Sequence, residues 1–282
     1  AGGAARCGRI YLRTVVHHSK PARLGIGIIS AGKVGAVLGA ALRACDHTIV
    51  GVHAVSEASR ERAAMLLPDV PLLPVEQIAE RSELLILTVP DDELPGLITY
   101  LASSGSITAG QLLVHTSGRH GTEIFAPATA LGAIGLAIHP AMTFTGLSMD
   151  LQRLNGTSFA VTGPAPFLPI AQALVVEMGG EPVHVAEADR ALYHAALAHA
   201  SNHLVTILAQ SQQMLASIGI EDPAHYMGPL VRAAVDNALA SGEGALTGPV
   251  ARGDAGTVAA HMRALGEYAQ GEKTGDITDS YA

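Results

Sequence analysis

The chain has 282 residues, of which 49% are hydrophobic and 15% are charged, so it contains enough apolar material for one large or two ordinary domains. Its net charge of −8 argues against nucleic acid as the main partner. Its apolar runs are too short to cross a bilayer, and two cysteines give no disulfide framework, which together predict a cytoplasmic protein without a membrane partner.

The beginning of the chain differs from the rest in charge. Residues 1–23 carry five basic side chains and no acidic one, whereas the remaining residues carry twelve basic and 25 acidic side chains. The segment also lacks the apolar periodicity of a helix or strand. We predict a flexible basic extension here, outside the folded domains.

A phosphate-binding turn is predicted directly after the first apolar run. The sequence LGIGIISAGKVG at 24–35 reads as a strand, a turn of small residues and the start of a helix, and this order holds a dinucleotide's pyrophosphate at a helix N-terminus. It matches the G-x-G-x-x-G fingerprint with serine in place of the first glycine. An ordinary glycine-rich turn without a ligand is the alternative. The predicted cofactor contacts of this turn are Ser30, Ala31, Gly32, Lys33, Val34 and Gly35.

Strands and helices alternate along the first two thirds of the chain. This order predicts a doubly wound α/β sheet of the Rossmann type over 24–187, followed by an all-α domain over 188–282. The predicted strands are 24–30, 47–54, 71–73, 83–89, 111–116, 132–139, 159–162 and 182–186. The predicted helices are 33–44, 57–66, one capped by Asp91-Asp92 and ending near 103, 166–178, 188–217, 222–241 and 254–265.

The residues after the second strand indicate which nucleotide binds. No acidic residue stands at the strand end, and Ser56, Ser59 and Arg60 could receive the 2′-phosphate of NADP. In a competing interpretation Glu57 binds the ribose of NAD, and in a third these residues only begin a helix with Ser56 as its N-cap. We predict NADP.

Polar residues also follow three further strands, where ligands of open α/β sheets bind. Val89 and Pro90 are predicted to line the ribose or nicotinamide, and Thr116 to contact the cofactor. Ser117 and His139 are predicted substrate contacts, although Ser117 could instead cap its turn.

The helical domain offers a second set of polar residues. At 100° per residue, His194 and Ser201 share one face of the helix 188–217, with Asn202 beside it. Arg252 lies in a shaped loop before a helix capped by Asp254, and its guanidinium could clamp a substrate carboxylate or pair with a helix carboxylate. The helix is therefore predicted to face a substrate site.

Other histidine chemistry is less well supported. His199 and His203 have the i, i+4 spacing of metal ligands, but no nearby carboxylate or cysteine completes a set, and we predict no metal. His115 is predicted to be a buried, hydrogen-bonded histidine of a strand rather than a catalytic one. A serine hydrolase is not indicated, because the chain lacks a G-x-S-x-G elbow.

Six motifs in this order resemble a bacterial family that joins a Rossmann domain of the NADP type to a C-terminal domain of unknown function. The resemblance extends from about Leu24 to at least Met262. The motifs are SAGKVG at 30–35, VPDDEL at 89–94, HTSG at 115–118, HPAMTF at 139–144, YHAALAHASN at 193–202 and LTGPVARGD at 246–254.

More remotely, the chain is similar to ketopantoate reductase, pyrroline-5-carboxylate reductase and the 6-phosphogluconate dehydrogenase group. Ketopantoate reductases carry a lysine at the start of the second-domain helix and an asparagine eight residues later. His194 and Asn202 have this spacing here, and the helix contains no lysine. The resemblance implies that His194 replaces the lysine as proton donor, because imidazole titrates near neutral pH, and that Asn202 orients the carbonyl.

These observations predict an NADPH-dependent reductase of a small oxo acid, for example one like ketopantoate, or of a related carbonyl or imine. The rival hypothesis is a sensor or assembly protein that binds NADP without catalysis, and a dehydrogenase that works in the oxidative direction is a third. The long C-terminal helices carry much apolar surface for so small a domain, so a homodimer through these helices is expected.

Overall fold

The structure is a computed structural model that describes residues 23–271, so the predicted basic extension lies almost entirely outside the described residues. The chain divides into two compact units, and the boundary between Ala195 and Ala196 falls within the long helix α8 (Arg190–Ser217). The domain boundary predicted after Glu187 lies shortly before this helix. Each unit is described separately.

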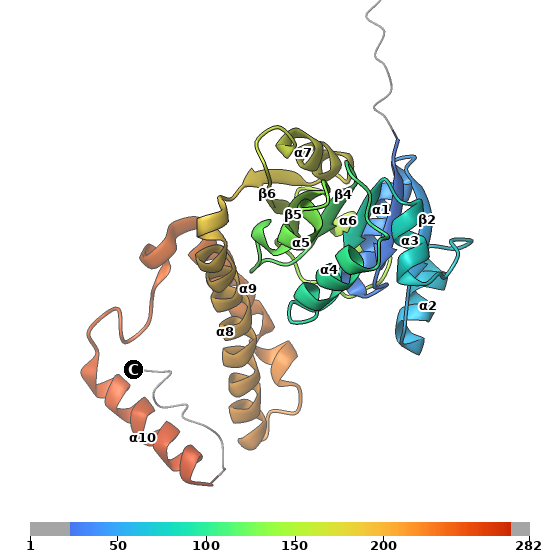
Figure 1. Cartoon of the computed structure of the whole chain (residues 1–282). Coiled ribbons are helices and arrows are strands. Elements are labelled where there is room, and N and C mark those ends of the chain that lie inside the picture. Colours follow the sequence, from blue (N-terminus) through green and yellow to red (C-terminus); the bar gives the residue numbers. More distant parts are fainter. Residues whose placement is uncertain (1–22, 272–282) are drawn as a thin grey trace, which may run out of the picture. The chain divides into compact units, whose positions relative to one another are not determined.

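The first unit is built on one seven-stranded sheet with the order β2-β1-β3-β4-β5-β6-β7 (Figure 1). Neighbouring strands are parallel except β5 and β6, which are antiparallel. The chain leaves β1 in one direction to form β2 and returns to the other side of β1 to form β3, so the sheet has the topological switch point of doubly wound folds. The strands are β1 (Gly25–Ile29), β2 (Thr48–His53), β3 (Leu84–Leu87), β4 (Leu112–His115), β5 (Ile134–Pro140), β6 (Ser158–Thr162) and β7 (Glu181–His184).

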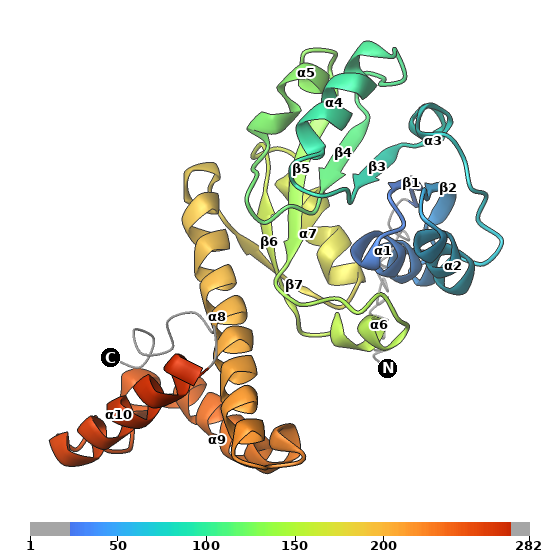
Figure 2. The same ribbon diagram turned by 90° about the horizontal axis from the view of Figure 1, so that it is seen from below.

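Helices cover both faces of this sheet (Figure 2). One face carries α1, α2, α6 and α7, and the other carries α3, α4 and α5. Their bounds are α1 (Lys33–Ala44), α2 (Glu57–Leu66), α3 (Val75–Arg81), α4 (Leu94–Ser103), α5 (Ala126–Thr129), α6 (Met149–Arg153) and α7 (Leu168–Glu177), with short 3-10 turns η1 (Glu123–Phe125) and η2 (Glu187–Asp189).

The central strands are buried on both faces, as their continuous apolar sequences predict. In β3, Leu84 and Ile86 join the core beneath α1 and α2, whereas Leu85 and Leu87 join the core beneath α3 and α4. The alternation of side chains along a strand therefore divides one sequence, LLIL, between two cores. The predicted Rossmann-type sheet is confirmed.

Two local predictions are wrong, and several short helices were not predicted. The predicted strand 71–73 forms only one isolated parallel bridge, between Val52 and Leu72. Helix α3 was not predicted, because its seven residues are too few for a clear apolar period. Helix α4 begins at Leu94 rather than at the aspartates, and no side chain caps it. Pro95 fixes this start, because proline without an N–H group suits the first turn of a helix.

The second unit contains only helices among its described residues. It comprises the rest of α8, then α9 (Pro223–Ser241), η3 (Gly242–Ala245) and α10 (Ala255–Gly271). Asp222 caps α9 through the N–H of His225, and Asp254 caps α10 through the N–H of Thr257, as predicted for Asp254. None of the side chains described from Ala196 onward is buried. Within residues 23–271, no helix has the length and apolar character needed to span a membrane.

Candidate functional site

A cavity of about 700 Å³ opens at the carboxyl ends of β1, β2 and β3. This position is the switch point of the sheet, where doubly wound folds bind their ligands. Six of the predicted cofactor contacts line the cavity: Ser30, Gly32, Ser56, Ser59, Val89 and Pro90. Its opposite wall comes from α3 and α4, through Val75, Glu93, Gly96, Leu97 and Tyr100, none of which was predicted.

The turn after β1 is held by hydrogen bonds to residues that follow or end two neighbouring strands. Ser30 has a positive φ of 79°, in the left-handed region that glycine adopts without strain and other residues rarely adopt. The Thr88 hydroxyl donates to the Ser30 carbonyl at 2.6 Å, and the Ala31 N–H donates to the His53 carbonyl at 2.9 Å. The turn is therefore rigid although a serine occupies its strained position.

The two glycines of the turn have different environments. A Cβ at Gly35 would lie 2.2 Å from the Ser30 carbonyl oxygen and 2.3 Å from the Thr88 hydroxyl, so α1 packs on β1 more closely than any side chain permits. A Cβ at Gly32 would meet nothing nearer than 3.5 Å. Gly32 is the N-cap of α1 and no side chain caps the helix, so its first N–H groups are available to an anion.

The residues predicted to bind a 2′-phosphate lie at the start of α2. The Ser56 hydroxyl caps α2 by accepting from the Ser59 N–H at 3.2 Å, as in the third interpretation considered for this segment. Arg60 turns back to the Ala54 carbonyl and does not line the cavity. Arg62, one helical turn from Ser59, lines it instead and donates to the Ala31 carbonyl at 2.9 Å. Its spacing of three residues from Ser59 on α2 was the signal that could have identified it.

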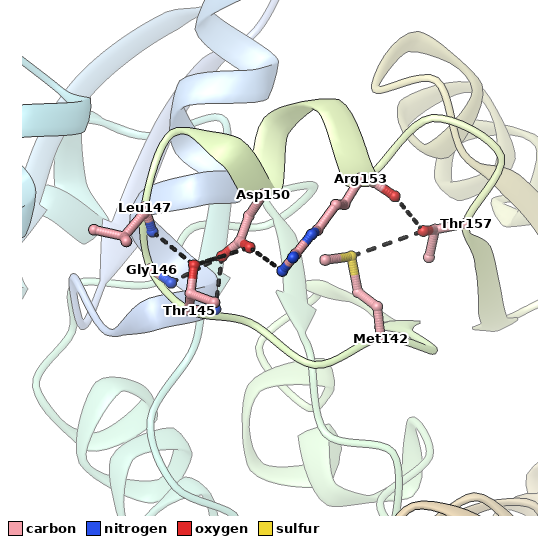
Figure 3. Close-up of polar contacts among 7 residues, drawn as sticks. All are labelled: Met142, Thr145, Gly146, Leu147, Asp150, Arg153 and Thr157. Atoms are coloured by element: carbon pink, nitrogen blue, oxygen red, sulfur yellow. Dashed lines mark hydrogen bonds and ion pairs between the residues drawn. The ribbon is translucent and has the colours of Figure 1, made fainter. Parts of the chain in front are cut away.

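A loop after β5 lies against the same region (Figure 3). Asp150 of α6 is fully buried and accepts from the N–H groups of Thr145 and Gly146 at 2.7 and 2.8 Å. Gly146 has a φ of 82°, and a Cβ there would lie 2.5 Å from Arg62 and 3.1 Å from Lys33. Asp150 thus fixes the loop that contacts both cations beside the cavity.

A cluster of polar residues lies at the carboxyl ends of β4 and β5, beside the start of α8. His139 Nδ1 and the Tyr193 hydroxyl form a hydrogen bond of 2.8 Å. The rings of His139 and His194 meet edge to face with centroids 6.2 Å apart. A Cβ at Gly118 would lie 2.7 Å from His194 and 2.9 Å from His139, so only a glycine lets the loop after β4 approach both rings.

Arg190 is the buried cation of this cluster and was not predicted. It is 1% exposed, and it donates to the Ser117 carbonyl at 2.5 Å and to the Thr162 hydroxyl at 3.0 Å. Its Nε has no hydrogen-bond partner, and no carboxylate of residues 23–271 lies within ion-pair distance of it. Burial lowers the pKa of Arg190, yet a guanidinium keeps its charge in proteins.

The ionisation of the neighbouring groups follows from burial and from this cation. Burial, together with the charges of Arg190 and His194, lowers the pKa of His139 to about 4, so this imidazole is neutral at pH 7. Burial raises the pKa of Tyr193, and the charge of Arg190 acts against this effect. The cluster therefore combines a neutral histidine, a protonated tyrosine and one buried positive charge.

His115 is a structural histidine, as predicted. It is fully buried, its Nδ1 accepts from the Ser117 N–H at 3.2 Å, and its Nε2 bonds the Gly121 carbonyl at 2.8 Å. These partners define the neutral tautomer with hydrogen on Nε2. Its ring also stacks on Phe125.

The remaining predicted residues are placed as follows. The buried Ser117 hydroxyl accepts from the N–H groups of Arg119 and His120, which is the turn-capping role considered for it. Thr116 follows β4 outside the cavity lining. The others belong to the second unit and are exposed: Ser201, Asn202 and Arg252.

The two histidines with metal-ligand spacing also lie in the second unit. The rings of His199 and His203 are 4.2 Å apart. The part of the chain that the structure describes holds no group of three or more His, Cys, Asp or Glu residues that could bind a metal ion.

Comparisons with known proteins agree with this architecture. Residues 14–140 match the Rossmann-like domain family, and residues 157–281 match the family of domains of unknown function DUF2520. The two matches lie one after the other and pair a Rossmann-like domain with a DUF2520 domain, which confirms the resemblance found in the sequence. A comparison with curated proteins found no match.

Solved structures share the fold at low sequence identity. A candidate NADP oxidoreductase from Bacteroides fragilis superposes with a TM-score of 0.72 at 20% identity, over 87% of this chain and 92% of that one. An imine reductase from Streptomyces aurantiacus gives 0.59 at 18% identity, over 76% and 74%. Pyrroline carboxylate reductase from Plasmodium falciparum, whose structure has NADP bound, gives 0.53 at 10% identity, over 78% and 80%.

Proposed function

We propose that the protein is an NADPH-dependent reductase of a small oxo acid or of a related carbonyl or imine compound. One arrangement carries this proposal: the nucleotide-sized cavity and the polar cluster around Arg190 lie along the same edge of one sheet, at the carboxyl ends of its strands. A cofactor in the cavity and a substrate at the cluster would then belong to one site. A location in the cytoplasm is part of the proposal.

The residues of the cavity fit a dinucleotide. The turn at Ser30–Gly32 and the uncapped start of α1 offer N–H groups to a pyrophosphate, and Gly32 leaves room for it. The apolar side chains of Val75, Val89 and Leu97 suit an adenosine. Bound NADPH would supply the hydride, and the protein would bind and orient it.

The same lining favours NADP over NAD. Ser56, Ser59 and Arg62 place two hydroxyls and one guanidinium at the end of β2, a combination that suits a 2′-phosphate. Glu57 is absent from the lining, and Glu93, which is present, comes from the N-cap of α4 rather than from β2. Arg62 replaces the predicted Arg60 in this proposal.

The charge of the cluster supports an anionic substrate. Arg190 is buried without a paired carboxylate among the described residues, so its field attracts a negative group to the exposed side of the cluster. An oxo acid supplies such a group. The roles predicted for Asn202 and Ser201 toward the carbonyl, and for Arg252 toward the carboxylate, remain predictions.

The test measures NADPH oxidation with ketopantoate, other 2-oxo acids and a five-membered cyclic imine. We expect turnover with at least one of them. We also expect Arg62→Ala to weaken NADPH binding about 10- to 100-fold, because it removes one charged contact to the 2′-phosphate. NADH binding should fall clearly less than NADPH binding, because NADH loses only the support that Arg62 gives the turn at Ala31, and the matched variant Arg60→Ala should bind both nucleotides as the wild type does.

The outcomes separate the candidate functions. Tight NADPH binding without turnover of any compound in the panel would favour the NADP-binding sensor. Turnover only of the corresponding alcohols with NADP+ would favour the oxidative dehydrogenase. Equal losses of NADPH and NADH binding in Arg62→Ala would contradict the assignment of the 2′-phosphate site.

A further inference from the structure

The side chains of the polar cluster include the candidates for the group that protonates the substrate. His139 is excluded as an acid at neutral pH, because burial and the nearby charges keep its imidazole neutral there. Arg190 is excluded because a guanidinium does not release a proton in proteins. Of the cluster residues Tyr193 and His194 therefore remain, and both lie near the start of α8.

The two candidates differ in how firmly they are held. The Tyr193 hydroxyl is fixed by His139 at 2.8 Å, and the ring centroid of Tyr193 lies 6.0 Å from the Arg190 guanidinium carbon. No hydrogen bond of the described residues fixes the ring of His194. A proton donor must be held in place to act efficiently, so geometry favours the tyrosine.

We propose that Tyr193 is the proton donor of the reaction, held by His139 and supported by the charge of Arg190. This inference rests on the proposed reductase function and replaces the role that the sequence assigned to His194. Tyr193 is only partly buried, whereas Arg190 is almost completely buried. A substrate can therefore contact Tyr193 directly, while Arg190 acts on it only through its electric field.

The chemistry balances with one tautomer of His139. With hydrogen on Nδ1, the imidazole donates to the phenolic oxygen, and the O–H of Tyr193 is free to point to the substrate. When a hydride adds to the carbon of the C=O or C=N double bond, a new C–H bond forms and the π electron pair moves to the substrate oxygen or nitrogen. The Tyr193 O–H bond then breaks, the proton bonds to that atom, and the tyrosinate takes a proton from water afterwards.

The surrounding charges suit a transient tyrosinate. The Nδ1–H of His139 would remain hydrogen-bonded to the phenolate, and Arg190 supplies the nearest positive charge. His194, Asp91 and Glu187 are the other titratable groups whose charges reach His139 or Arg190. Because the guanidinium has no carboxylate partner among residues 23–271, its charge is not cancelled locally.

The main test compares Tyr193→Phe with His194→Asn, using NADPH and the panel compound that the wild type reduces best. We expect Tyr193→Phe to lower kcat at least 100-fold with little change in KM, since a general acid contributes about 10²–10⁴-fold. His194→Asn should lose less than 10-fold. Tyr226→Phe, the same change at an exposed tyrosine of α9, is the control and should behave as the wild type does.

A second readout needs neither substrate nor cofactor. The tyrosinate absorption of Tyr193 is obtained by titrating the free protein and subtracting the titration of Tyr193→Phe. If His139 donates to the phenolic oxygen, His139→Ala should move this absorption to higher pH. An unchanged titration would contradict the proposed tautomer.

The results also distinguish the two proposals. A wild type that reduces no compound of the panel overturns the reductase function and this inference with it. An active wild type whose Tyr193→Phe variant keeps more than a tenth of its kcat overturns only the role of Tyr193. A larger loss in His194→Asn than in Tyr193→Phe would return the role of donor to His194.

Discussion

Ser30 shows how one residue can depart from a motif and keep its geometry. It occupies the position of the first glycine and has a φ of 79°, which costs a non-glycine residue about 1 kcal/mol. Hydrogen bonds from Thr88 to the carbonyls of Ile29 and Ser30 hold the strained backbone. The serine therefore fits the tight turn because Thr88, directly after β3, supports it.

His115 makes stability depend on pH. Its pKa is lowered from 6.5 to about 4 by burial, so the unfolded chain binds more protons than the folded one between these values. The stabilisation by neutral His115, about 3 kcal/mol, is complete above pH 6.5 and is lost as the pH falls to 4. His139, whose pKa is lowered to about 4 as well, acts in the same direction.

Urea unfolding between pH 7 and pH 4.5 tests this dependence. We expect the free energy of unfolding of the wild type to fall steadily over this range. His115→Gln should be less stable at pH 7 and should show a shallower fall, because one shifted group has been removed. His184→Asn, at an exposed histidine of β7, should follow the wild-type curve, and an identical slope in His115→Gln would refute the assignment.

At the scale of elements, the contact of α1 with β1 and β3 decides the shape of the phosphate turn. Gly35→Ala would place a methyl group 2.2 Å from the Ser30 carbonyl oxygen, so α1 would have to move away from the sheet. We expect a loss of stability of about 1–3 kcal/mol and weaker NADPH binding. Chemical denaturation and nucleotide titration measure the two effects.

The matched variant is Gly266→Ala in α10, where the new methyl group would meet nothing within 4 Å. Alanine is a better helix former than glycine by about 1 kcal/mol, so this variant should be as stable as the wild type or more so. The same substitution would thus have opposite effects in two helices. A neutral Gly35→Ala would show that the turn tolerates a displaced helix.

At the scale of the whole molecule, we propose a homodimer formed through the helices of the second unit. None of the side chains described from Ala196 onward is buried, and Leu230 and Leu239 of α9 are 74% and 83% exposed. A helical unit of this size with no buried side chain of its own leaves apolar surface for a second copy to cover.

Light scattering coupled to size exclusion measures the mass in solution. We expect a dimer for the wild type and a larger monomer fraction for Leu230→Glu, which places a charge on the exposed face of α9. Leu131→Glu, the same change at a 46% exposed leucine of the first unit, should remain dimeric. A monomeric wild type would refute the dimer, and a dimeric Leu230→Glu would place the interface elsewhere.

The sequence alone determined those features that depend on neighbours along the chain. Apolar runs and helical periods predicted the Rossmann-type sheet, α1 and α2 with their observed bounds, and the positions of Ser30, Gly32 and Gly35. Local hydrogen-bonding habits likewise predicted the cap at Asp254 and offered the cap at Ser56 as one interpretation. Such features follow from backbone geometry and side-chain chemistry within a few residues.

Only the tertiary structure decided which distant groups meet. Arg62 lines the cavity and Arg60 does not. The side chain of Arg62 extends from α2 to Ala31 in the turn after β1, whereas the side chain of Arg60 extends back to Ala54. Arg190 and Tyr193 join Ser117 and His139 because α8 begins beside the ends of β4 and β5. Arg190 and Ser117 are 73 residues apart and Tyr193 and His139 are 54 residues apart, so no local sequence pattern links them. Their burial and their hydrogen bonds in the folded chain, which a sequence does not display, made these residues candidates for function.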